Sequence, residues 1–169
     1  MAPDTFPGNL QKFTPSQLAK GGAQTPTVTL TGPGLQFVSS IAFDVTGNLW
    51  LTNDVDSIAE YTAAQLAAGG AQTPNVVLID GAVPCIFAGS TPPPPFCNGP
   101  DGLAFDNSGS LWVAHGVATA SETIVKYTAS QLTSSGSPTP AVTLTTNGTS
   151  IIGSVGLTFY PHASGLPIH

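Results

Sequence analysis

Charged side chains are scarce in this sequence, and arginine is missing altogether. Only 7% of the 169 residues are charged, no arginine is present, and three lysines stand against nine acids, which gives a formal net charge of -6. Recognition of a phosphate backbone or an anionic membrane surface depends on clustered Lys and Arg side chains. The composition therefore argues against nucleic acid as a partner.

Long apolar runs are also missing. No segment approaches the roughly 18 apolar residues of a membrane-spanning helix, although 41% of the residues are hydrophobic. The opening residues lack the basic and apolar regions of a secretory signal peptide. We expect no membrane span, and the apolar residues are expected to form a packed core.

Internal repetition is what the sequence has in abundance. One segment occurs three times, at 13–30, 61–78 and 127–144. Each copy has Thr at its second position and Gln three residues later, the spacing of a capping box that opens a helix. Gly-Gly or Ser-Gly follows where a helix would end, so each copy predicts a helix of one or two turns. The β-branched run at the end of each copy then predicts a strand.

A second module alternates with the first. Segment 40–53 matches 102–115, and 156–169 is a degenerate third copy. Each predicts a β-hairpin, because two short apolar runs flank a turn rich in Gly, Asn, Asp or Ser. We name the hairpin strands a and b, the strand before the helix c and the strand after it d. The order is then c-d, a-b-c-d, a-b-c-d, a-b, which predicts one all-β domain over 1–169 made of four-stranded antiparallel β-propeller blades.

The residues Gly-Leu-Ala-Phe-Asp-Asn-Ser-Gly-Ser-Leu-Trp-Val-Ala at 102–114, followed by Ile-Val-Lys-Tyr at 124–127, resemble the NHL-repeat propellers and the related gluconolactonase (regucalcin-type) superfamily. The resemblance implies a six-bladed ring, whereas this chain has strands for three blades, one of them split between its ends. Because the final a-b pair is what the initial c-d pair lacks, we expect two chains to complete the ring as a two-fold homodimer. The alternative is a piece of a longer propeller.

In the resembled propellers, the d-to-a and b-to-c connections share the face that usually binds ligands. In this chain that face would receive Asn53, Asp54, Asp56, Asp80, Asp101, His115 and Glu122. An acidic face without arginine suits a metal, another cation or a neutral polyol better than an anion. The alternative is that most of these acids are solvated loop residues.

The string Gly99-Pro-Asp-Gly-Leu103 resembles the Pro-Asp-Gly motif of gluconolactonase-type enzymes. The resemblance implies that Asp101 binds a divalent cation, Ca²⁺ or Zn²⁺, and serves lactone hydrolysis. Such a site needs several converging oxygen ligands, for which Asn98 and Asn53 are candidates.

Only two cysteines occur, Cys85 and Cys97, both in a long d-to-a connection over 79–101 that also contains four consecutive prolines. Two cysteines in such a surface loop predict a disulfide, with a pair of free thiols as the alternative. A disulfide implies an oxidising compartment, so we expect a secreted or periplasmic protein.

Three functional hypotheses follow from these patterns. The first is a binding or scaffold protein that presents an acidic loop face to a small molecule, a glycan or a protein. The second is a metal-dependent lactone hydrolase that uses Asp101. The third is an inactive propeller fragment or assembly intermediate.

Overall fold

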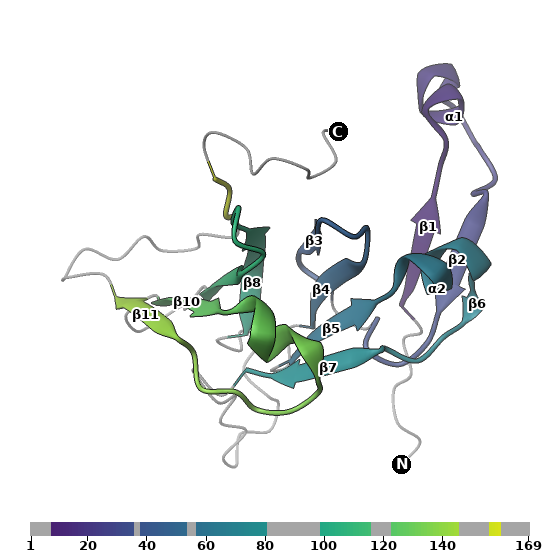
Figure 1. The fold of residues 1–169 in the computed structure, drawn as a ribbon. Coiled ribbons are helices and arrows are strands. Elements are labelled where there is room, and N and C mark those ends of the chain that lie inside the picture. Colours follow the sequence, from purple (N-terminus) through teal and green to yellow (C-terminus); the bar gives the residue numbers. More distant parts are fainter. Residues whose placement is uncertain are drawn as a thin grey trace, which may run out of the picture.

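The computed structural model describes residues 8–35, 38–53, 57–80, 99–115, 123–145 and 156–159. These residues form three β-sheets with a few short helices (Figure 1), which confirms the predicted all-β class. The first sheet contains β1 (Asn9–Lys12), β2 (Val28–Thr31) and β6 (Gly70–Ala71). The second contains β3 (Ile41–Phe43), β4 (Leu49–Asn53), β5 (Ser57–Tyr61) and β7 (Val76–Ile79). The third contains β8 (Pro100–Phe105), β9 (Leu111–His115), β10 (Thr123–Tyr127) and β11 (Val142–Thr145).

The second and third sheets each consist of four antiparallel strands that are neighbours in the order of the chain. They match the predicted order a-b-c-d. Equivalent residues occupy equivalent registers: Trp50 pairs with Glu60 in the second sheet, and Trp112 pairs with Lys126 in the third. In the first sheet, β1 and β2 form the predicted antiparallel c-d pair. We call β2, β7 and β11, the last strands of the three copies, the outer strands.

Three short helices connect strands c and d, as predicted. They are α1 (Pro15–Lys20), α2 (Ala63–Ala68) and the 3₁₀ helix η1 (Ala129–Thr133). Gln17 Oε1 accepts the backbone N–H of Thr14 at 2.8 Å, while Thr14 Oγ1 accepts the N–H of Gln17 at 3.2 Å. The same capping box recurs at the start of α2. None of the helices in the described ranges has the length and apolarity needed to cross a membrane.

The second and third sheets pack together through a shared apolar core, which includes an aromatic contact. The rings of Trp50 and Phe105 meet edge to face, with centroids 6.1 Å apart. The rings of Trp112 and Phe159 make the equivalent contact at 5.9 Å. Segment 156–159 therefore lies against the third sheet as β8 lies against the second, which is the place predicted for the next strand a. The remainder of the predicted final hairpin lies outside the described residues.

Strand β6 was not predicted. The sequence indicated only that Gly69 and Gly70 end a helix, and Gly69 does so with φ 64°. In addition, Gly70 pairs in parallel with Leu30, so that the residues after α2 cover the free edge of the outer strand β2. The next copy repeats this arrangement, because Gly136 pairs in parallel with Leu78 of β7. Covering an edge in this way protects it from unwanted strand pairing.

The contact between β2 and the residues after α2 leaves no room for a side chain at Gly32. A Cβ there would lie 1.9 Å from the backbone oxygen of Gln72, whereas a Cβ at Gly70 would meet no atom within 4 Å. Both glycines have a positive φ. We expect Gly32→Ala to lower the free energy of unfolding by about 3 kcal/mol and Gly70→Ala by about 1 kcal/mol. Urea unfolding of the two variants measures the difference, and equal losses would contradict the close contact.

Candidate functional site

The predicted site residues that the structure describes lie at one end of the two complete sheets. Asn53 ends β4, His115 ends β9, and Asp80 directly follows β7. Asp101 belongs to the first residues of β8, whose Pro100 pairs with His115. The other predicted residues lie outside the described residues: Asp54, Asp56, Asn98, Glu122, Cys85 and Cys97.

Asp101 occupies an irregular position in its strand. Pro100 pairs with His115 and Gly102 pairs with Ala114, so Asp101 is the extra residue of a β-bulge. The sequence placed Asp101 in the loop before the strand, whereas the strand already begins at Pro100. Bulges re-aim side chains and are frequent next to functional sites. Asp101 is half-buried at this point, next to the Pro100 and His115 pair.

His115 belongs to a buried polar network. Its Nε2 lies 2.6 Å from Asp80 Oδ2, and Tyr127 donates its hydroxyl to Asp80 Oδ1 at 2.7 Å. The hydroxyl of Thr123 lies 3.3 Å from His115 Nδ1. Since a carboxylate accepts only, the contact with Asp80 assigns a hydrogen to Nε2, while the Thr123 hydroxyl beside Nδ1 can donate or accept.

The network joins the two complete sheets. Asp80 follows the outer strand of the second sheet, whereas His115 and Tyr127 belong to β9 and β10 of the third. All three side chains are buried, so Asp80 is not the solvated loop acid that the sequence suggested. Burial, together with the adjacent Asp80 carboxylate, raises the pKa of Tyr127 far above its usual value. The arrangement fixes one sheet against the other and holds His115 through both ring nitrogens.

The corresponding tyrosine of the second sheet has a different partner. Tyr61 donates its hydroxyl to the backbone oxygen of Pro33 at 2.5 Å. Burial raises the pKa of Tyr61 to about 12. Each complete sheet is thus tied to the preceding copy by a tyrosine hydroxyl from its strand c.

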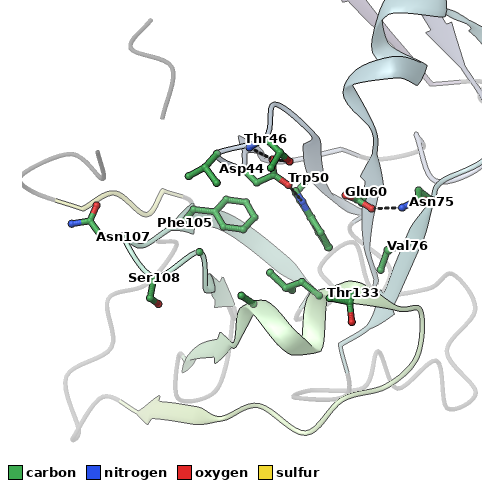
Figure 2. Close-up of a pocket in the computed structure, with 14 residues that line it drawn as sticks. Asp44, Thr46, Trp50, Glu60, Asn75, Val76, Phe105, Asn107, Ser108 and Thr133 are labelled. Atoms are coloured by element: carbon green, nitrogen blue, oxygen red, sulfur yellow. Dashed lines mark hydrogen bonds between the residues drawn. The ribbon is translucent and has the colours of Figure 1, made fainter. Parts of the chain in front are cut away.

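A groove opens at the opposite end of the two sheets, where the two a-to-b turns and the helix η1 meet. Its volume is about 600 Å³. Trp50, Val76 and Phe105 supply an apolar lining, while Asp44 and Glu60 bring carboxylates (Figure 2). The resemblance to known propellers placed the ligand face at the other end of the sheets, so no site was predicted here.

Glu60 is the most unusual residue of this groove. Its side chain lines the groove, yet the residue is only 6% exposed. Figure 2 shows Glu60 between Trp50 and Asn75, whose Nδ2 donates to Glu60 Oε2 at 2.7 Å. Among the described residues, the other oxygen, Oε1, has no hydrogen-bond partner. A buried acceptor without a donor is costly, which makes this oxygen a candidate ligand contact.

The third sheet has a lysine at the position of Glu60. Lys126 pairs with Trp112 across the strands as Glu60 pairs with Trp50. Lys126 Nζ lies 2.9 Å from Asp106 Oδ2 and 5.2 Å from the centroid of the Trp112 ring. An ammonium group therefore lies between a carboxylate and an indole ring in the third sheet, whereas the second sheet has a carboxylate in the place of the lysine.

The aspartates of the two a-to-b turns mainly hold their own turns together. Asp44 accepts the N–H groups of Thr46 and Asn48 and, at 3.3 Å, the indole N–H of Trp50. Partial burial raises the pKa of Asp44, but these hydrogen bonds outweigh it and leave the pKa below the usual value. Asp106 has the same bonds and, with Lys126 in addition, a pKa held far below its usual range against the opposing effect of burial. Both carboxylates therefore stay ionised near neutral pH.

Two signals for the groove were present in the sequence. The equivalent positions Lys12, Glu60 and Lys126 differ in the sign of their charge within an otherwise regular repeat. Glu60 also lies two residues after Ile58 in the predicted strand, which places a carboxylate on the same face as an apolar side chain.

Within the described ranges, no group of three or more His, Cys, Asp or Glu side chains is placed to hold a metal ion. Comparisons with protein-family models, with curated proteins and with solved structures gave no match.

The two buried tyrosines make stability depend on pH in the alkaline range. In the unfolded chain they ionise near pH 10, whereas the folded protein keeps Tyr61 protonated to about pH 12. The folded state therefore holds these protons more tightly, and their stabilising effect is complete below about pH 10 and lost as the pH rises toward 12. Urea unfolding at several pH values should show a shallower alkaline decline for Tyr61→Phe and for Tyr127→Phe than for the wild type. Identical slopes would contradict the assigned shifts.

Proposed function

We propose that this protein is a non-catalytic binding or scaffold protein of the β-propeller type, whose groove between the second and third sheets binds an organic cation with a primary amine. The observation that carries this proposal is the buried Glu60 carboxylate, which lines the groove with one oxygen lacking a hydrogen-bond partner within the described residues. A ligand donor would satisfy this oxygen.

The class of ligand follows from the charge at the groove and from the third sheet. Glu60 and the ionised Asp44 both line the groove, and a pair of carboxylates favours a cation over a neutral or anionic group. The contact of Lys126 with Asp106 and Trp112 shows how the same framework accommodates an ammonium group. The apolar surface of Val76 and Phe105 suits a short hydrocarbon part of the same molecule.

Titration with ethanolamine, followed by the indole signal of Trp50 in NMR spectra, tests the proposal. Ethylene glycol is the neutral counterpart of the same size. We expect ethanolamine to shift the Trp50 signal, ethylene glycol to shift it much less, and Glu60→Gln to weaken ethanolamine binding about tenfold, because the charge-assisted hydrogen bond is lost. Equal responses to the two probes, or an unchanged affinity in Glu60→Gln, would contradict an amine site.

The variant Glu60→Lys provides a matched control, because it gives the second sheet the residue found in the third. Its ammonium group should occupy the groove, abolish ethanolamine binding and change the free energy of unfolding by no more than about 1 kcal/mol. The reverse change, Lys126→Glu, brings two carboxylates together at Asp106 and should be destabilising.

A metal-dependent lactone hydrolase is the second candidate function, and the β-bulge at Asp101 favours it. Under this hypothesis Asp101 ligates Ca²⁺ or Zn²⁺ at the end of the sheets opposite the groove. Calorimetry with each ion should then detect binding that Asp101→Ala abolishes and Asp106→Ala, on the other end of the sheet, leaves intact. Absence of binding to the wild type, or binding that survives Asp101→Ala, would exclude this candidate.

We further infer that two chains complete a six-bladed ring. Two open positions support this inference. β1 pairs with β2 but with no strand b in the described residues, and segment 156–159 lies in the place of a strand a against the third sheet. The a-b hairpin of one copy and the c-d pair of another would together make one blade.

A further inference from the structure

Within the described residues, the free edge of an outer strand is covered twice, each time by a parallel pairing with residues that follow the next helix. In the first instance Leu30 of β2 pairs in parallel with Gly70, and in the second Leu78 of β7 pairs with Gly136. Ile79 N donates to Gly136 O at 2.8 Å, and Gly136 N donates to Val77 O at 3.0 Å. The covering residues always belong to the next copy of the repeat and directly follow its helix.

In the part of the chain that the structure describes, no segment pairs with the outer edge of the third outer strand, β11. All four of its residues are exposed. Leu144 is 49% exposed, whereas its equivalent Leu78 is completely buried. The covered strand β2 and the strand β11 have the same sequence, Val-Thr-Leu-Thr, and Leu30 of β2 is only 2% exposed, so the difference arises from the missing neighbour.

The first copy contains residues equivalent to those that cover an outer strand, but among the described residues no outer strand pairs with them. Gly21 and Gly22 have φ values of 63° and 68°, close to the 64° and 70° of Gly69 and Gly70. A Cβ at Gly69 would lie 2.8 Å from Val28 of β2, whereas a Cβ at Gly21 would meet no atom within 4 Å. The backbone after α1 thus has the shape that receives an outer strand, without a strand beside it.

Apolar side chains show the same pattern on the helices. Leu132 of η1 is 8% exposed because it packs in the core with Leu78, whereas the equivalent Leu18 of α1 is 69% exposed. Figure 1 shows α1 and β11 on opposite sides of the molecule, so a single chain does not bring them together.

We propose that the edge of β11 is covered by residues 15–24 of a second copy of this chain. This proposal rests on the two-chain ring inferred above and defines a contact separate from the shared blade. By the register of the two internal examples, Gly22 of one copy pairs in parallel with Leu144 of the other, and Leu18 packs against Leu144. The occupant is a second copy because the segment that fits β11 is present, already shaped and uncovered, in this chain.

Sedimentation velocity of the full chain over a concentration series tests the contact. The wild type should reach twice the chain mass of 17.0 kDa. Leu144→Glu should raise the dimer dissociation constant about 100-fold, since each dimer loses two buried leucine contacts of about tenfold each. Ile79→Glu places the same charge on an exposed apolar residue of an outer strand that is already covered, and it should behave like the wild type.

The double variant Leu18→Lys with Leu144→Glu should recover part of the lost affinity through a new ion pair.

The outcomes separate this contact from the ring itself. A wild type that stays at 17.0 kDa would overturn both proposals. A dimeric wild type with Leu144→Glu indistinguishable from Ile79→Glu would overturn only the β11 contact. Hydrogen exchange of the wild type gives a readout that needs no variant: the amides of Gly22 and Thr145, equivalent to the bonded Gly136 and Ile79, should be protected in the dimer. Rapid exchange of both amides in the dimer would also overturn the contact. That result is expected if another protein or further repeats, rather than a second copy, cover β11.

Discussion

The contact between consecutive copies of the repeat is the constraint on which the structure depends. An outer strand has a free edge, and a free edge is a liability unless another segment covers it. Here the cover comes from the residues that follow the next helix, and after α2 the glycine Gly69 both ends the helix and lies in close contact with β2. The edge-to-face contact of Trp50 with Phe105 and the bonds of Asp80 add specificity to the same junction. No copy therefore satisfies its own edge, and each depends on the one that follows.

Local signals in the sequence predicted most of the fold. The capping boxes, the turn residues and the β-branched runs act over three to eight residues, and the helices and strands formed where they indicated. The prediction missed β6 and the burial of Asp80, which both depend on residues distant along the chain. Gly70 pairs with Leu30, and Asp80 bonds to His115 and Tyr127. A helix-ending glycine has the same local signature whether or not a strand lies beside it, so its second role was not visible before the copies were placed together.

The candidate site was harder to predict because it depends on a departure from the repeat. The resemblance to ligand-binding propellers predicted a site at the end of the sheets that carries Asp101 and His115, where both ring nitrogens of His115 have partners within the chain. The groove lies at the other end, and its distinctive residue, Glu60, occupies a position where the other two copies have lysine. The reversed charge of Glu60 relative to the equivalent residues Lys12 and Lys126 is the sequence feature that marks the groove, and no known motif does.

The two ends of the sheets thus differ in how their polar groups are used. At one end, Asp80 joins two sheets, and both of its oxygens accept hydrogen bonds from within the chain. At the other end, Lys126 and Asp106 neutralise one another in the third sheet, whereas among the described residues the Glu60 side chain has one donor, the amide of Asn75. Burying a carboxylate with a single neutral donor is unfavourable for folding. A ligand bound in the groove would supply the interaction that Glu60 Oε1 lacks among the described residues, whereas the Asp80 network leaves no carboxylate oxygen without a donor.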